Sequence, residues 1–161
     1  DVGTKPEDSA LEQMGDFVRQ MHTTSKLLDE LPGGMSLAEA EAEVIEYITK
    51  WVPEPKKAQL AGNSVGTDRM LLARDMPEVI DYLHYRIIDV STIKELARRW
   101  YPRAYFQSPA KNGGHRALGD IQDSINELRY YREAIFVPAP GPDSAAAKKI
   151  AARISESAAK S

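Results

Sequence analysis

The 161 residues are enough for one domain with a hydrophobic core, and an apolar fraction of 42% with a mean hydropathy of -0.44 is ordinary for a globular protein. No apolar run approaches the roughly 18 residues of a membrane span, and the lack of cysteine excludes disulfides and thiolate zinc sites. The net charge of -3 argues against a protein that coats long nucleic acid, although a short oligonucleotide could bind where carboxylates carry metal ions. We expect a cytoplasmic protein with no membrane partner.

Apolar residues at helical spacing predict two main helices before residue 53. The first follows a capping box of Ser9 and Glu12 and is followed by a short helix over 26–31. The second begins at a capping box of Ser36 and Glu39. Each of the two has one apolar face, made of Leu11, Met14, Val18 and Met21 in the first and Leu37, Ala40, Val44, Ile48 and Trp51 in the second.

Two short buried strands are predicted in the middle of the chain. One ends at about Ala61, and residues 62–66 then lead into a helix that carries Asp68; the two glycines of that turn permit a tight bend and a close approach to a ligand. Pro77 opens a short helix that ends near residue 83. The other strand lies in the β-branched segment 86–90, and Thr92 with Glu95 forms a capping box for the next helix.

A long helix is predicted over 117–134, after an irregular loop over 103–114. Prolines beyond residue 137 predict a linker, and the tail rich in Ala, Lys and Ser forms at best a frayed helix. We therefore divide the chain into a domain over 1–137 and a linker with a tail over 138–161. Strands that alternate with helices indicate the α/β class. The core stripe of the long helix is apolar and consists of Leu118, Ile121, Ile125, Leu128 and Ile135.

Three polar residues suit phosphodiester hydrolysis. His115 and Asp120 lie near the start of the long helix, and Asp68 lies near the start of an earlier one. Two divalent ions held by carboxylates can activate a water, neutralise the phosphate and stabilise the leaving oxygen, while a histidine can accept the proton of the water. Two carboxylates are too few for two metals, so the set is incomplete. Each residue also has a structural interpretation, such as Asp68 beside a helix dipole.

Four longer blocks of sequence resemble the oligoribonuclease family of DEDDh-type 3′→5′ exonucleases. They are GNSVGTDR at 62–69, HYRIIDVSTIKELARRW at 84–100, HRALGD at 115–120 and ELRYYRE at 127–133. The His-x-x-x-x-Asp spacing is shared by many DEDDh exonucleases, whereas the block at 84–100 is much more specific. The resemblance covers about residues 11–137. It implies an α/β, RNase H-like exonuclease fold with a mixed sheet flanked by helices.

The resemblance also implies a homodimer that degrades dinucleotide-sized, single-stranded RNA to mononucleotides with two Mg²⁺ or Mn²⁺ ions per site. It implies that Asp68 and Asp120 are metal ligands and that His115 is the general base. Tyr85 matches an active-site tyrosine that the partner subunit contributes. Four further residues match a clamp on the 5′ phosphate, and one matches an aromatic residue that stacks on a base: Ser64, Arg86, Ser91 and Thr92, and Phe17.

Structural roles are the alternatives for these residues. Arg86 and Ser91 could form a salt bridge and a helix cap, and Tyr85 could be an interface or core aromatic. Phe17, at helical spacing with Met14 and Met21, could be part of the core.

One motif of the resembled family is missing before Asp68, namely an apolar strand that carries Asp and Glu two residues apart. Asp29-Glu30 does not fit, because it lies in a predicted helix. Together with Asp1 in place of an initiator Met, this predicts an N-terminally truncated piece without those strands and their two catalytic carboxylates. The alternatives are a non-catalytic relative that binds RNA or a protein, and a DEDDh exonuclease that acts on DNA or tRNA ends. The retained Asp68, His115 and Asp120 argue against the first, and the block at 84–100 against the second.

Overall fold

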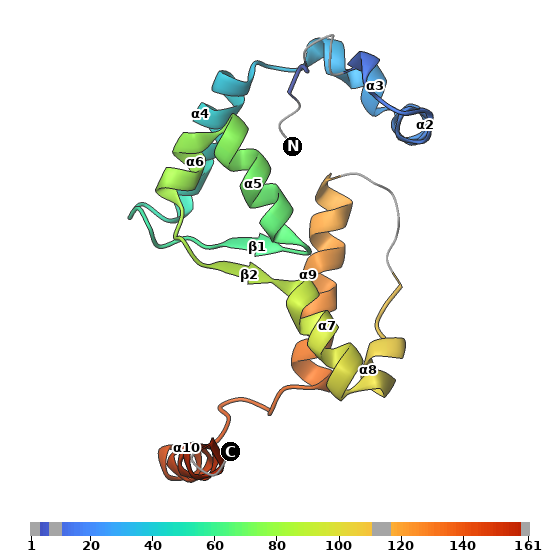
Figure 1. The fold of residues 1–161 in the computed structure, drawn as a ribbon. Coiled ribbons are helices and arrows are strands. Elements are labelled where there is room, and N and C mark those ends of the chain that lie inside the picture. The colour runs from blue at the N-terminus through green and yellow to red at the C-terminus, as the bar shows by residue number, and fades with distance from the viewer. Residues whose placement is uncertain (1–3, 7–10, 111–116, 159–161) are drawn as a thin grey trace.

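In the computed structural model, which describes residues 4–6, 11–110 and 117–158, the elements in chain order are α2 (Asp16–Thr24), α3 (Leu27–Glu30), η1 (Leu31–Gly33), α4 (Leu37–Trp51), β1 (Leu60–Gly62), α5 (Val65–Asp75), α6 (Pro77–Tyr82), β2 (Ile87–Asp89), α7 (Val90–Trp100), α8 (Pro102–Phe106), α9 (Ala117–Ala134) and α10 (Ser144–Ala158). Helices α4, α5 and α6 lie on one side of a two-stranded sheet, and α7 and α9 lie at one end of its strands (Figure 1). Among the described helices, none is long and apolar enough to cross a membrane.

The two strands pair in parallel, with Leu60 opposite Ile87 and Gly62 opposite Asp89. A parallel pair needs a crossover connection, which here consists of α5 and α6. Both predicted strands are confirmed, but the prediction that they are buried is wrong: no residue of β1 is buried, and Ile87 and Ile88 of β2 are 38% and 41% exposed. In the described part of the chain the sheet has only these two strands, so β2 is not enclosed on both faces as an inner parallel strand would be.

Capping residues set where the helices begin. The predicted capping box of α4 is confirmed, because the Ser36 hydroxyl accepts a hydrogen bond from the Glu39 N–H and the Glu39 carboxylate accepts one from the Ser36 N–H. The predicted box of Thr92 with Glu95 is wrong. Instead Asp89, the last residue of β2, accepts the Ser91 N–H at 2.9 Å, so α7 begins directly after the strand. The other predicted capping residue, Ser9, lies outside the described residues.

The prediction of a loop over 103–114 is wrong for its first residues, which belong to helix α8, beginning at Pro102. Proline suits the first position of a helix, since its fixed backbone angle is helical and its missing N–H would have no partner there. The α8 helix is held to α9 by a hydrogen bond of 2.7 Å that the Tyr130 hydroxyl donates to the Ala104 carbonyl. Residues 111–114 of the predicted loop lie outside the described residues.

The ends of α9 agree with the prediction, but its predicted core stripe is wrong. Leu118 and Ile121 are 69% and 55% exposed, whereas three residues at four-residue spacing are buried: Asp123, Glu127 and Tyr131. This polar face is turned inward because α9 packs against α7, which supplies a charged partner for Glu127. The apolar stripe borders an open cavity beside β1 instead.

The tail forms a continuous helix, α10, rather than the frayed one expected. Figure 1 shows α10 apart from the α7–α9 group, and its Ile150 and Ile154 are exposed. The division of the chain into 1–137 and 138–161 stays a prediction.

We predict that Ser36→Ala lowers the free energy of unfolding by about 1 kcal/mol, because the first turn of α4 loses its cap, while Ser36→Gly costs only a few tenths. Urea-induced unfolding of both variants measures the difference. The hydrogen bonds from Ser36 lower the pKa of Glu39 below its usual 4.5. The stabilisation from the ionised Glu39 carboxylate is therefore present at neutral pH and is lost as the pH falls through that lowered value. Equal costs for the two variants would contradict the capping role.

Candidate active site

Asp68 and Asp120 line one cavity of about 530 Å³ between β1, α5 and α9. Asp68 belongs to the first turn of α5 and Asp120 to the first turn of α9. Two carboxylates that are far apart in the sequence are thus brought to the same hollow. The walls around them are mainly apolar and include Leu60, Val65, Leu72, Val90, Ile121 and Ile125.

The turn between β1 and α5 takes its shape from Ser64 rather than from the two glycines around it. Ser64 has φ 54° and ψ 32°, the left-handed conformation, which is uncommon for a residue with a side chain. Neither Gly62 nor Gly66 has a positive φ. The prediction that these glycines make the turn possible is therefore wrong. The strained residue is held by its own backbone N–H, which donates to Asp89 Oδ1 at 3.0 Å and to Ser91 Oγ at 2.9 Å.

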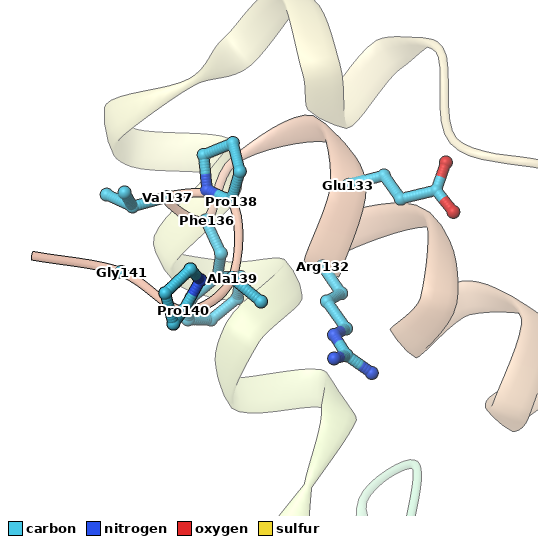
Figure 2. Close-up of a pocket in the computed structure, with 8 residues that line it drawn as sticks. All are labelled: Arg132, Glu133, Phe136, Val137, Pro138, Ala139, Pro140 and Gly141. Atoms are coloured by element: carbon cyan, nitrogen blue, oxygen red, sulfur yellow. The ribbon is translucent and has the colours of Figure 1, made fainter.

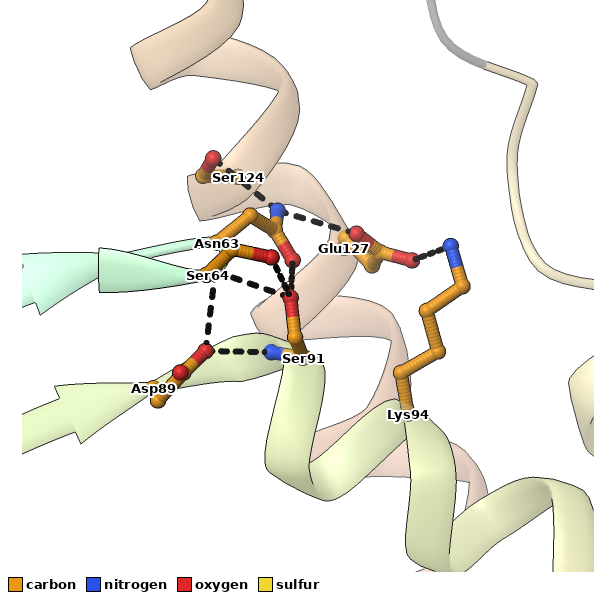
Figure 3. A network of polar contacts seen from close by, with 7 residues as sticks. All are labelled: Asn63, Ser64, Asp89, Ser91, Lys94, Ser124 and Glu127. Carbon is orange, nitrogen blue, oxygen red and sulfur yellow. Dashed lines mark hydrogen bonds and ion pairs between the residues drawn. The ribbon is translucent and has the colours of Figure 1, made fainter. Parts of the chain in front are cut away.

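Ser64 and Ser91, the serine pair, lie where the two strands end (Figure 3). Their hydroxyl oxygens are 3.1 Å apart, and the Ser91 hydroxyl donates to Asn63 Oδ1 at 3.1 Å. The carboxyl ends of parallel strands meet at one edge of a sheet, so these residues come together although they are 27 positions apart. Two hydroxyl groups at one edge can bind an acceptor-rich group such as a phosphate.

A buried ion pair lies behind the serine pair. The Glu127 side chain is 5% exposed, and its two carboxylate oxygens accept from Lys94 Nζ at 3.1 Å and from Asn63 Nδ2 at 3.0 Å. The hydrogen bond with Glu127 raises the pKa of Lys94, against the opposing effect of burial. Asn63 Nδ2 also donates to the Ser124 hydroxyl at 3.0 Å. These contacts tie β1, α7 and α9 together.

Two of the other predicted site residues, Tyr85 and Arg86, are not gathered at this edge. Tyr85 and Arg86 precede β2, so they lie beyond the opposite end of the strand from Ser91. The ring of Tyr85 stacks on His84 with centroids 4.5 Å apart, and the Arg86 guanidinium lies 5.4 Å from the Tyr85 centroid. Thr92 is exposed in the first turn of α7. His115 lies outside the described residues.

The structure also decides between some of the structural alternatives. Arg86 makes no salt bridge with any other described residue, and the cap of α7 is Asp89 rather than Ser91. Phe17 is 80% exposed on α2, so the interpretation of this residue as part of the core is wrong. Tyr85, 69% exposed, is likewise not a core residue within this chain.

A second hollow of the same volume, about 530 Å³, lies where α9 leads into the proline-rich linker (Figure 2). Arg132 and Glu133 of α9 line it together with residues 136–141. Volume therefore does not distinguish the two hollows, and the lining residues do. Neither Asp68 nor Asp120 reaches the second hollow, which makes the cavity between β1, α5 and α9 the candidate site.

Carboxylate oxygens are the ligands that Mg²⁺ and Mn²⁺ prefer, so Asp68 and Asp120 fit a divalent cation chemically. They are a partial set, because no group of three or more His, Cys, Asp or Glu side chains that could hold a metal occurs within the described ranges 4–6, 11–110 and 117–158.

Sequence analysis missed five residues that shape the site: Asn63, Asp89, Lys94, Ser124 and Glu127. Four of them lie inside the quoted blocks 62–69, 84–100 and 127–133, where charged and amide residues stand among apolar ones. Their partners come from distant parts of the chain, so spacing along the sequence carried no signal for the contacts.

The sequence of this chain is similar to those of several known proteins. A family model described as an exonuclease of the RNase T type matches residues 4–128. The chain is 69% identical to an oligoribonuclease of Streptomyces griseus over 159 residues, which is 99% of this chain and 79% of that protein. It is 59% identical to an oligoribonuclease of Leifsonia xyli subsp. xyli, over 94% of this chain and 73% of that protein. With an oligoribonuclease of Mycobacterium tuberculosis the identity is 52%, over 98% and 74%.

We predict that Asp68→Asn and Asp120→Asn each weaken Mn²⁺ binding about tenfold or more, because each change removes the negative charge of a candidate ligand. Electron paramagnetic resonance of free Mn²⁺ measures the affinity. Glu133→Gln is the matched control, because it removes a carboxylate from the second hollow, which neither Asp68 nor Asp120 lines. An affinity unchanged in both aspartate variants would contradict a metal site in this cavity.

Proposed function

The chain belongs to the oligoribonuclease family of exonucleases, and we propose that it removes mononucleotides from the 3′ ends of very short RNAs. The observation that carries this proposal is the meeting of Asp68 and Asp120 in one cavity, next to two hydroxyl groups at the edge of the sheet. A carboxylate pair suits the reacting phosphodiester, and the Ser64 hydroxyl, held in place by Ser91, suits a second phosphate of the same short substrate.

Divalent ions, Mg²⁺ or Mn²⁺ and two per site, are the proposed cofactor. When bound, they neutralise charge on the phosphate and lower the pKa of the attacking water. Asp68 and Asp120 hold ions in this proposal, and His115 accepts the proton of the water. Asp68 and Asp120 are both exposed at the cavity, so ions from solvent can reach their carboxylates.

The 5′ phosphate of the substrate is assigned to Ser64 and Ser91, with Thr92 beside them on α7. Arg86 is assigned to the same clamp on its place in the block 84–100 alone, since in this chain it lies beyond the other end of β2, with its guanidinium 5.4 Å from the Tyr85 ring centroid. Phe17 presents an exposed ring that suits stacking on a base, an interaction that tolerates any sequence.

We also propose a cytoplasmic homodimer in which Tyr85 completes the site of the partner subunit. The Tyr85 ring is exposed and stacked between His84 and the Arg86 guanidinium, so it is available to a second chain. Further exposed apolar side chains lie nearby in the sequence, on β2 and α7: Ile87, Ile88, Leu96 and Trp100. Exposed apolar surface of this kind is typical of an interface.

If a clamp holds the 5′ phosphate, loss of that phosphate from a diribonucleotide should lower kcat/KM about tenfold to a hundredfold. A charge-assisted hydrogen bond contributes roughly 1.5–3 kcal/mol, which corresponds to that range. Steady-state hydrolysis of matched 5′-phosphorylated and 5′-hydroxyl diribonucleotides with Mn²⁺ measures it. Equal turnover of two-residue and twenty-residue RNAs would count against the assignment.

If Tyr85 acts in the site of the partner subunit, Tyr85→Ala and Asp68→Ala should each be inactive alone and active when mixed. In a symmetric dimer with free exchange, half of the mixed dimers are heterodimers with one complete site, so activity should recover to about a quarter of the unmutated level. Subunit exchange is followed separately with tagged chains. Full exchange without any recovery would place Tyr85 in its own subunit or outside catalysis.

A further inference from the structure

Three residues to which the proposed function gives no role form a continuous polar chain behind the serine pair: Asn63, Glu127 and Lys94 (Figure 3). We propose that they are positioning residues that hold Ser64 and Ser91 in the geometry that binds the 5′ phosphate. This inference rests on the proposed function, because it names the residues that shape a clamp which that function requires.

Glu127 is the fixed point of this chain. A buried carboxylate is costly unless it is paired and hydrogen-bonded, and here each of its two oxygens accepts a hydrogen bond from a different element. Lys94 of α7 reaches one oxygen at 3.1 Å, and Asn63, directly after β1, reaches the other at 3.0 Å. The position of Glu127 is thereby determined from two sides, and it determines in turn where the Asn63 amide lies.

The orientation of the Asn63 amide follows from its partners. Its NH₂ group donates to Glu127 and to the Ser124 hydroxyl, and Ser124 itself donates to the Asp120 carbonyl at 2.9 Å. A flipped amide would turn its oxygen toward the Glu127 carboxylate, which cannot donate when ionised. The amide oxygen must therefore face Ser91, whose hydroxyl donates to it at 3.1 Å.

The hydrogens of the serine pair are then assigned in sequence. Ser91 has one hydroxyl hydrogen, which Asn63 takes, so the Ser91 oxygen accepts from the Ser64 N–H and from the Ser64 hydroxyl. These bonds fix Ser64 in its left-handed conformation. The Ser64 hydroxyl hydrogen is the one that can be redirected, because rotation about the Cβ–Oγ bond moves it from the Ser91 oxygen to an incoming phosphate oxygen while the Ser64 N–H keeps its own contacts. Without Asn63, the Ser91 hydroxyl has no fixed direction, and the serine pair is no longer held in one hydrogen-bonding arrangement before the phosphate binds.

The test is equilibrium binding of fluorescently labelled 5′-phosphorylated and 5′-hydroxyl diribonucleotides to the 161-residue chain, with EDTA present to prevent cleavage. The unchanged chain should bind the phosphorylated form about tenfold more tightly or better. Equal affinity for the two forms would overturn the phosphate clamp itself, and this inference with it. The preference of the unchanged chain therefore tests the proposed function, and the variants test the positioning role.

Asn63→Ala should reduce the preference for the 5′ phosphate to within about twofold, while the affinity for the 5′-hydroxyl form changes little. Asn126→Ala is the matched control, since Asn126 is an exposed amide on α9 whose contacts are Gln122 and Arg129, and it should keep the full preference. An Asn63→Ala variant that folds and keeps the preference would overturn the inference. So would an equal loss of affinity for both nucleotides, because that result indicates general damage.

The ion pair supplies a second, independent test should Asn63→Ala fail to fold. Lys94→Met removes the Lys94 ammonium from the buried Glu127 carboxylate and should reduce the preference several-fold. Adding Glu127→Gln removes that charge while an amide oxygen still accepts from Asn63, so the double variant should recover the preference to within about twofold of the unchanged chain. A double variant as poor as Lys94→Met would show that Lys94 binds the phosphate directly, which overturns the positioning role.

Discussion

The parallel pairing of β1 with β2 is the constraint on which the site depends. With Gly62 opposite Asp89, the residues that follow the two strands, Ser64 and Ser91, emerge at the same edge of the sheet. Helices α5 and α7 begin at that edge, and Asp68 lies one turn into α5. An antiparallel pair would have placed Ser64 and Ser91 at opposite edges. The crossover through α5 and α6 therefore places the hydroxyl pair beside the candidate metal ligand.

The packing of α9 brings the second carboxylate, Asp120, to this edge and fixes its position along the helix axis. The buried Glu127 carboxylate meets both Lys94 and Asn63, so sliding or rotation of the helix would break the contacts of a buried charge with two other elements. Asp120 is seven residues earlier on the same helix, two turns and about 10 Å along its axis. The contact that holds the helix thus also sets the depth at which Asp120 enters the cavity. Stability and site geometry share one interaction here.

Local signals in the sequence predicted most of the fold, and long-range partners account for what they missed. The capping box of Ser36 with Glu39 and the proline at 77 each act within a few residues of a helix start, so the starts of α4 and α6 could be predicted from the sequence. The buried face of α9 could not be predicted in this way. Apolar spacing predicts that Leu118 and Ile121 are buried, whereas Glu127 is buried through partners 33 and 64 positions away in sequence. The left-handed turn was assigned to glycines, since only the contacts of Ser64 with Asp89 and Ser91 stabilise that conformation in a serine.

The proposed preference for very short RNA has a simple geometric basis in α5. Ser64 caps this helix and Asp68 is four residues further on, so the two are separated by about 6 Å along the helix axis. A 5′ phosphate held at the serine pair and a phosphodiester cleaved beside Asp68 must then be neighbours on the same strand. A longer RNA would have to place its remaining nucleotides where the Asn63–Glu127–Lys94 chain fills the space behind the pair with buried polar contacts. In the proposed function, this arrangement favours a substrate whose 5′ phosphate and cleaved phosphodiester are adjacent, which is a diribonucleotide.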